Sequence, residues 1–259
     1  MRTRILTGIA VCFTAFFLWG SFALAEGTLQ ICTFEYPLFM SKTPIPGRGY
    51  GFLVDSTNAA LEAVGLKANY HFFPMKRSIA MVAKGEYDAF LGTIAHFPQE
   101  TRTQFNNIKM GELRFILYYL NDEAQPAFYF NELGDLKKYR IGTVQGSSSV
   151  PLLRKSGIEP DFARNLEINF NKLLAGRIDL CVALELPAKY IINSLSPSQQ
   201  SRIAKIDKPM MSISVDFIVN LNKAGSEEIY KKVEKGLEGI KNKGIYQEIV
   251  TRYYGKDGI

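Results

Sequence analysis

Two features of the sequence could bind a negatively charged group. Arg77 lies in the first turn of a helix predicted to open after Pro74, where a cation is poorly placed relative to the helix dipole unless an anion or a partner offsets it. The turn Gly146-Ser147-Ser148 presents backbone N–H groups and hydroxyls at the start of another predicted helix, a ready site for a carboxylate. A surface ion pair for Arg77 and an ordinary helix cap for the serines are the alternatives.

Other candidate residues lie at the ends of predicted strands. Gly92 and Thr93 follow a short strand, at the edge where open α/β sheets bind ligands. Tyr36 follows the first strand and precedes a Pro-rich loop, so its ring could stack on a ligand while its hydroxyl stays hydrated. Phe52 adjoins the same loop. Core packing is the alternative for both aromatic residues.

The sequence carries no residue set typical of catalysis or metal binding. His71 and His96 lack a second ligand at metal-binding spacing, so no metal and no cofactor is expected. Glu35, Glu185 and His96 could act as acids or bases, but no nucleophile motif or Gly-rich phosphate loop accompanies them. A binding function is therefore favoured over catalysis.

The elements that must position these residues alternate between strands and helices, which predicts two α/β units with mainly parallel sheets. Asp55 is the predicted cap of the first helix. A long loop at 35–51, with three prolines and three glycines, is expected at the mouth of a site. The predicted strands are 29–34, 67–72, 87–91, 140–144 and 178–183, and the predicted helices are 56–64, 75–84, 150–155, 169–175 and a pair within 226–254 interrupted near 243–244.

The N-terminus is typical of an export signal. Arg2 and Arg4 precede an apolar stretch at 5–19 and the small residues of Ala-Leu-Ala at 23–25, which predicts a cleaved signal peptide over 1–25. The apolar stretch is short for a membrane span. Cys12 lies inside it rather than at a lipoprotein cleavage point, so a soluble periplasmic form is predicted.

The composition of the chain without that segment excludes two classes of protein. Losing Arg2 and Arg4 from 31 basic residues leaves 29 against 25 acidic ones, a net charge of +4. The lysines are scattered instead of forming a basic stripe, so no nucleic-acid partner is expected. Cys32 and Cys181 are too few for a disulfide scaffold. They lie in apolar runs typical of buried thiols, although a disulfide between them stays open.

Four stretches, in their order and spacing, give the chain after the signal segment a resemblance to bacterial solute-binding protein family 3, the polar amino-acid receptors of ABC importers. They are 51–55 (GFLVD), 84–89 (KGEYDA), 139–148 (YRIGTVQGSS) and 176–179 (GRID), and the ending at 243–255 is also similar. The resemblance implies an α/β fold of the periplasmic-binding-protein type II class, a monomer with two lobes joined by two crossover strands and a ligand cleft between them. Lobe 1 would comprise 26–120 with 215–259, and lobe 2 would comprise 121–214.

The resemblance also implies roles for particular residues. Arg102 falls where family members place the arginine that grips a ligand carboxylate, and Arg77 resembles a cleft residue of a divergent branch. Members that bind α-amino acids usually place an aspartate at the position of Leu184, where it pairs with the ammonium. Either the adjacent Glu185 replaces it through a shifted turn, or the ligand lacks an α-ammonium, as an organic acid does.

The sequence as a whole predicts a periplasmic receptor that captures a small polar ligand, an amino acid or an organic acid, by lobe closure. It would deliver the ligand to the inner-membrane permease of an ABC importer. Two alternatives stay open: a periplasmic sensor subunit, and a dehydratase-like enzyme of the same fold.

Overall fold

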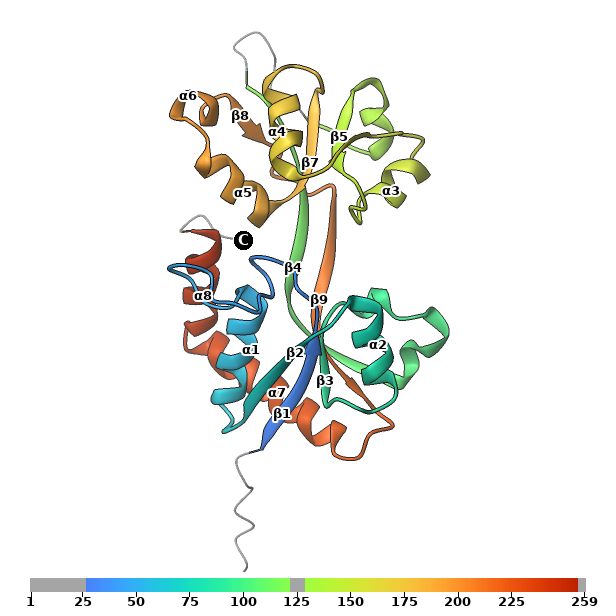
Figure 1. Ribbon diagram of the computed structural model, residues 1–259, viewed down its shortest axis with the longest axis vertical. Helices are drawn as coiled ribbons and strands as arrows, with labels where there is room; N and C mark the ends of the chain where they lie inside the picture. The colour runs from blue at the N-terminus through green and yellow to red at the C-terminus, as the bar shows by residue number, and fades with distance from the viewer. Residues whose placement is uncertain (1–26, 122–128, 256–259) are drawn as a thin grey trace, which may run out of the picture.

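A computed structural model describes residues 27–121 and 129–255. The predicted signal peptide at 1–25 lies outside these ranges. Figure 1 shows two groups of helices and strands stacked along the long axis of the molecule and joined by two long strands, β4 (Phe105–Leu120) and β9 (Met211–Asn220). In the described ranges, no helix is both long and apolar enough to cross a membrane.

The lower group in Figure 1 contains both the first and the last elements of the chain. Its strands β1, β2 and β3 pair in parallel, α1 packs against α7 and α8, and α2 packs against β1 and β3. The elements are β1 (Thr28–Thr33), α1 (Phe52–Glu62), β2 (Lys67–Phe72), α2 (Met75–Ala83), β3 (Ala89–Gly92), the 3-10 turns η1 (Ile94–His96) and η2 (Gln99–Gln104), α7 (Ser226–Asn242) and α8 (Ile245–Tyr254).

The upper group is built from the middle of the chain. Its strands β5, β6 and β7 are also parallel, and β8 pairs antiparallel with β4. The elements are η3 (Leu133–Lys138), β5 (Ile141–Val144), α3 (Val150–Lys155), β6 (Asp161–Ala163), α4 (Leu166–Leu174), β7 (Leu180–Leu184), α5 (Glu185–Ser194), α6 (Pro197–Gln200) and β8 (Ile203–Lys205).

The pairing of β4 with β9 sets opposite directions for the two parallel groups of strands. The order in the sheet is β2-β1-β3-β9-β4-β7-β5-β6. β3 pairs antiparallel with β9, β9 with β4, and β4 with β7. Strand β3 therefore has the same direction as β4, and β7 has the opposite direction. The carboxyl ends of the two groups therefore point toward each other.

The register of these strands fixes the separation between the two edges. Gly92 at the end of β3 is opposite Asp216, which is opposite Lys109 of β4. Leu184 at the end of β7 is opposite Phe115 of β4. The β4 segment between Lys109 and Phe115 spans about 20 Å at about 3.3 Å per residue, and a β-bulge near Lys109 bends it.

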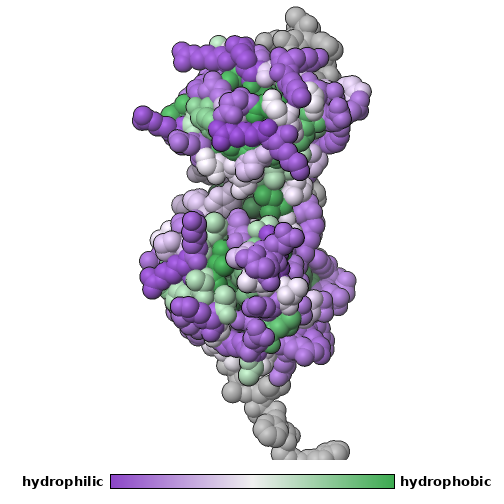
Figure 2. All heavy atoms as spheres, turned by 90° about the vertical axis from the view of Figure 1, so that its right-hand side faces the viewer, coloured by the Kyte–Doolittle hydropathy of each residue, from purple (hydrophilic) through white to green (hydrophobic). Residues whose placement is uncertain are grey.

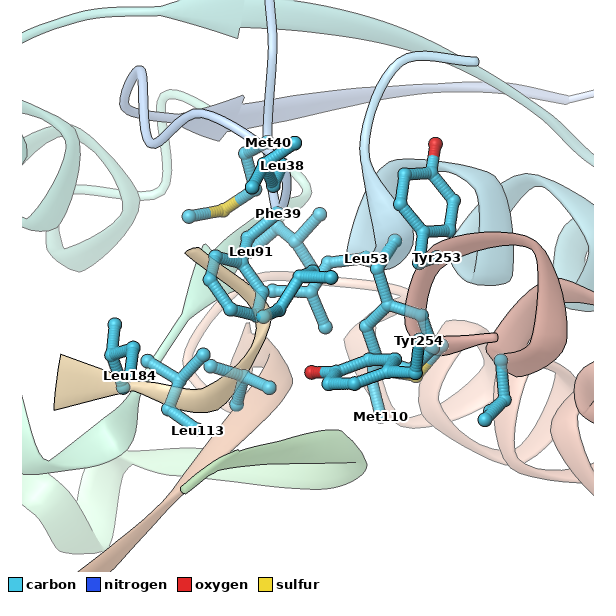
Figure 3. Close-up of a cluster of buried hydrophobic side chains, with 14 of the residues drawn as sticks. Leu38, Phe39, Met40, Leu53, Leu91, Met110, Leu113, Leu184, Tyr253 and Tyr254 are labelled. Atoms are coloured by element: carbon cyan, nitrogen blue, oxygen red, sulfur yellow. The ribbon is translucent and has the colours of Figure 1, made fainter. Parts of the chain in front are cut away.

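A single apolar cluster runs through the junction of the two groups. Figure 3 shows the loop residues Leu38, Phe39 and Met40 packed near Leu53 of α1, and Leu184 of β7 beside Leu113 of β4. Elements of both groups thus contribute to one hydrophobic core, and the loop after β1 is held by its own buried side chains.

Phe52 lies at the centre of an aromatic cluster in the lower group. Its ring is fully buried and meets the rings of Tyr246, Tyr253 and Tyr254 edge-on, at centroid distances of 5.9, 6.2 and 5.6 Å. This geometry favours aromatic pairs, because the positive edge of one ring faces the negative face of the other.

The prediction that Asp55 caps a helix starting at residue 56 was wrong. Helix α1 begins at Phe52 with Gly51 as its N-cap, because the apolar side chains that follow Gly51 are needed in the core. The Asp55 carboxylate instead accepts hydrogen bonds from the Tyr50 N–H (3.0 Å) and the Tyr253 hydroxyl (2.7 Å). Gly51 has φ 112°, and a Cβ there would lie 2.5 Å from the Phe39 carbonyl, so only glycine fits.

Most other predicted elements are confirmed. The strand at 67–72 and the helix at 150–155 have the predicted bounds, and the break between α7 and α8 falls at Lys243-Gly244. Cys32 and Cys181 are free and buried. Burial raises the pKa of the Cys32 thiol to about 12 and raises that of Cys181 as well, so both thiols are unreactive.

The burial of Phe52 leads to a stability prediction. Phe52→Ala removes the ring from the cluster and should lower the free energy of unfolding by about 3 to 5 kcal/mol, measured by urea denaturation followed by circular dichroism. Phe52→Leu, the matched control, should lose less because it leaves a smaller cavity. A Phe52→Ala loss below about 1 kcal/mol would contradict this packing role.

Candidate functional site

The two facing strand edges define the candidate site, which we call the cleft. One edge consists of the residues that follow β1, β2 and β3, and the other of those that follow β5, β6 and β7. Figure 2 shows the molecule narrowing between its two groups of elements, with apolar side chains exposed at the waist. Ligand sites in α/β proteins form at the carboxyl ends of strands, so this place suits a small ligand.

Tyr36 lies beyond the end of β1 in an aromatic group. Its ring stacks on Phe39 at 5.4 Å and lies 6.1 Å from the Phe34 ring. Burial raises the pKa of the Tyr36 hydroxyl to about 12, so the phenol stays neutral at physiological pH. The residue is half-buried and can offer both a ring face and a hydrogen-bond donor.

Arg77 lies in the first turn of α2, just beyond the end of β2. Its guanidinium lies 4.8 Å from the centroid of the Phe73 ring, and its side chain is exposed. It forms no ion pair with any residue of 27–121 or 129–255. A cation–π contact orients the guanidinium without neutralising it, so its charge remains available to an anion.

Gly92 and Thr93 shape the backbone at the end of β3. A Cβ on Gly92 would lie 2.4 Å from the Phe90 ring, so the close packing of this strand end requires glycine. The buried Thr93 hydroxyl accepts a hydrogen bond from the Ala95 N–H at 3.2 Å and thereby caps η1. Both residues thus set the course of the backbone at this edge of the cleft.

Arg102 braces η1 in this structure. Its Nε donates to the Phe97 carbonyl at 3.0 Å and its Nη2 to the Ala95 carbonyl at 2.8 Å. Two of its three nitrogens are thus committed to the loop after β3. The carboxylate-gripping role implied by the resemblance stays a prediction.

Asp216 on β9 is a residue that the sequence analysis missed. It is fully buried, and its Oδ2 accepts hydrogen bonds from the Ile94 N–H and the Ser214 hydroxyl, both at 3.2 Å. Burial raises the pKa of its carboxyl group, and the Ile94 N–H partly opposes that shift. The signal was visible in the sequence, since Asp216 interrupts the apolar run at 215–219.

The turn after β5 is organised by hydroxyl groups. Gly146 has φ 78°, which glycine adopts freely. The Ser147 hydroxyl lies 2.8 Å from the Ser149 hydroxyl, which lies 3.1 Å from that of Thr143. Ser148 is exposed and its side chain forms no hydrogen bond within the described chain, so it is the serine of this turn best placed to meet a ligand.

Glu185, the first residue of α5, is held between two cations. Its Oε1 lies 2.7 Å from Lys205 Nζ and its Oε2 lies 3.1 Å from Arg114 Nη1, and only 12% of its side chain is exposed. The neighbouring Leu184 belongs to the apolar cluster beside Leu113 (Figure 3). Pairing of Glu185 with a ligand ammonium would therefore have to displace Lys205 or Arg114, although the buried Oε2 accepts no hydrogen bond from a described residue.

The structure does not bring every predicted residue to the cleft. Phe52 is enclosed in the aromatic cluster described above and has no exposed surface with which to contact a ligand. In the described parts of the chain, no three His, Cys, Asp or Glu side chains are grouped as metal ligands would be.

The fold and the two facing strand edges define a two-lobed binding protein of the periplasmic-binding-protein type II class. The sequence matches the model of the bacterial extracellular solute-binding proteins, family 3, over residues 30–256. The chain belongs to this family. A search of curated protein sequences found no match.

Solved structures share the fold at low sequence identity. The L-cystine solute receptor of Neisseria gonorrhoeae, in its unliganded open conformation, has 18% identity and a TM-score of 0.66, over 90% of this chain and 94% of that one. An ancestral cationic amino acid solute-binding protein has 18% identity and a TM-score of 0.64, over 88% and 96%. A histidine kinase sensor domain has 17% identity and a TM-score of 0.60, over 89% and 97%.

His96 at the edge of the cleft leads to a pH prediction. Burial lowers its pKa, so the unfolded chain binds this proton more readily than the folded one. Stability should therefore fall as the pH drops from about 7.5 to about 5.5, through the ordinary histidine pKa. His96→Gln should reduce that fall, measured as the change in urea midpoint between the two pH values.

His71→Gln is the matched control, because it leaves His96 in place and should retain the contribution of His96. Asp216 and the other carboxyl groups are present in the unsubstituted protein and in both variants. The comparison of their pH-dependent stabilities therefore isolates the imidazole of His96. An unchanged pH dependence in His96→Gln would show that this histidine does not contribute.

Proposed function

We propose that this protein is a periplasmic solute receptor that captures a small polar ligand, an amino acid or an organic acid, by closing two lobes around it. The observation that carries the proposal is the opposition of two parallel strand edges across the β4 segment between Lys109 and Phe115. A ligand between them is contacted from both sides, so its binding favours the closed arrangement. The liganded protein would then engage the permease of an ABC importer as a monomer.

The lobes proposed from the sequence are 26–120 with 215–259 and 121–214. The directions of β4 and β9 support this division, since the two strands run between the groups and the other strands of each group pair locally. The β-bulge near Lys109 lies between the two edges, where a change of backbone angle would swing one lobe against the other. The resulting motion would be a hinge closure.

The proposed export and transport functions are supported by the family and by the N-terminal sequence. The family is described as extracellular, and the predicted signal peptide at 1–25 agrees with that location. Two neighbours of the same fold are receptors for L-cystine and for cationic amino acids, which supports a small polar ligand for this chain as well.

Two other functions are compatible with this fold. A sensor role is favoured by the likeness to a histidine kinase sensor domain, and a neighbouring gene pair for a permease and an ATPase would argue against it. Catalysis is less well supported, because Glu185 is held by two cations and Asp216 is fully buried, so neither is placed to transfer a proton to a ligand.

The candidate contacts differ in how well their positions support binding. Tyr36, Arg77 and Ser148 have side-chain groups that can reach a ligand, and they come from both edges of the cleft. Gly92 and Thr93 would contribute the backbone at the end of β3. Ser147 and Gly146 would shape the turn on the opposite side.

Ligand capture predicts stabilisation and compaction together. Mature protein stripped of ligand by unfolding and refolding should gain about 2.7 kcal/mol at a ligand concentration of about 100 times the dissociation constant. The unfolding midpoint should rise by about 5 to 11 °C. Small-angle X-ray scattering should show a smaller radius of gyration with the same ligand.

Tyr36→Ala should lower the affinity for the ligand by about tenfold or more, so that stabilisation and compaction need a higher ligand concentration. Tyr129→Ala, which removes an exposed tyrosine before η3 rather than after one of the strands whose ends form the cleft, is the control and should respond normally. If none of the twenty amino acids and no small organic acid produces both effects, the receptor proposal fails.

A further inference from the structure

We propose that the ligand of the cleft is a carboxylate that carries no ammonium group. The inference rests on the receptor function proposed above and names its ligand class. It is drawn from the charged side chains at the two strand edges: the carboxylates at the ends of β3 and β7 are buried beside donors or cations, whereas Lys76, Arg77 and Arg164 are exposed and form no ion pair with a described residue.

Glu185 is the carboxylate closest to the end of β7, and two cations surround it. Lys205 and Arg114 occupy its two oxygens at 2.7 and 3.1 Å. A ligand ammonium could bind there only by displacing one of them, which would leave a cation without its partner in a largely buried place. The group of three carries a net positive charge and therefore repels an ammonium.

Asp216 is the carboxylate at the end of β3. It is fully buried under η1 and already accepts hydrogen bonds from the Ile94 N–H and the Ser214 hydroxyl. Because Asp216 has no exposed surface, a ligand atom can reach it only if the residues around it move. Lys109 on β4 further offsets its negative charge.

Other carboxylates near the strand ends are Glu35, Glu100, Glu112 and Glu167. Glu35 accepts hydrogen bonds from the Lys42 N–H at 2.9 Å and the Ser41 hydroxyl at 3.2 Å, and Glu112 pairs with Lys109. Glu100 on η2 and Glu167 in the first turn of α4 are exposed, where water solvates them and a single ion pair contributes little.

Three other cations follow strands of the same edges. Lys76 and Arg77 follow β2, and Arg164 follows β6 on the opposite side of the cleft. All three are exposed, and none forms an ion pair with any described residue. A carboxylate between them would gain charge-assisted hydrogen bonds from both lobes, whereas an ammonium would be desolvated without a counter-ion on closure.

Leu184 completes the argument at the end of β7. Its side chain lies in the apolar cluster beside Leu113 (Figure 3) and offers no acceptor. The lobe-2 edge thus offers a ligand a serine turn and Arg164, and no acceptor from Leu184. This combination suits the carboxylate of an organic acid.

Matched ligand pairs that differ only in the ammonium test the inference directly. Each pair consists of an α-amino acid and its des-amino acid: L-aspartate with succinate, L-glutamate with glutarate, L-leucine with 4-methylpentanoate and L-phenylalanine with 3-phenylpropanoate. Calorimetric titration of the stripped mature protein should show that a des-amino acid binds at least about tenfold more tightly than its amino partner, a difference of about 1.4 kcal/mol.

Two variants test the charges that carry the inference. Arg77→Gln should weaken binding of the des-amino acid about tenfold or more, while Lys235→Gln on the outer face of α7 should leave it unchanged. Glu185→Gln should strengthen binding about threefold, since it frees the positive charge of Lys205 and Arg114. If Glu185 held a ligand ammonium instead, the same variant would lose binding.

The outcomes separate this inference from the receptor function. Tighter binding of an amino acid than of its des-amino partner, with compaction in scattering, would overturn the inference and leave the receptor function standing. Absence of binding and compaction with every member of the pairs, the other standard amino acids and other small organic acids would overturn both.

Discussion

The antiparallel pairing of β4 with β9 is the constraint on which the rest of the structure depends. Because β3 and β7 each pair antiparallel with one of these two strands, at different ends, the two parallel groups run in opposite directions. Two edges that could have faced away from each other are thereby opposed. A parallel pairing at either end would have turned one set of strand ends out to solvent, and no cleft would form between them.

Much of the fold could be predicted from local signals, and the failures have physical causes. Pro74 and the left-handed Gly157 mark real ends of helices, because proline fixes φ and glycine tolerates positive φ. The start of α1 was misplaced because Gly51 caps the helix by fitting against Phe39, a tertiary contact. The full lengths of β4 and β9 could not be inferred, since each serves two groups of strands that only the folded sheet brings together.

The positions of the strand ends could be predicted from the sequence, whereas the partners of the side chains at them could not. The strand ends that carry Tyr36, Gly92 and Ser148 were found, because the alternation of strands and helices locates the carboxyl edges of a sheet. The partners of Glu185 were not found, since Arg114 and Lys205 approach it from strands far away in the sequence. Strand register decides which distant charges pair, and the register cannot be inferred from composition or residue spacing.

Asp216 and Arg102 together would keep one edge of the cleft fixed during the proposed closure of the lobes. Asp216 holds the Ile94 N–H from β9, and Arg102 holds the Ala95 and Phe97 carbonyls from the other side. The backbone of η1 is thus bonded both to a crossover strand and to η2. Because these bonds are made within the lower group of elements, a hinge motion near the bulge of β4 would carry η1 as part of a rigid body. The ligand would then meet a preformed lower edge, and the energetic cost of closure would fall on the upper edge and the crossover strands.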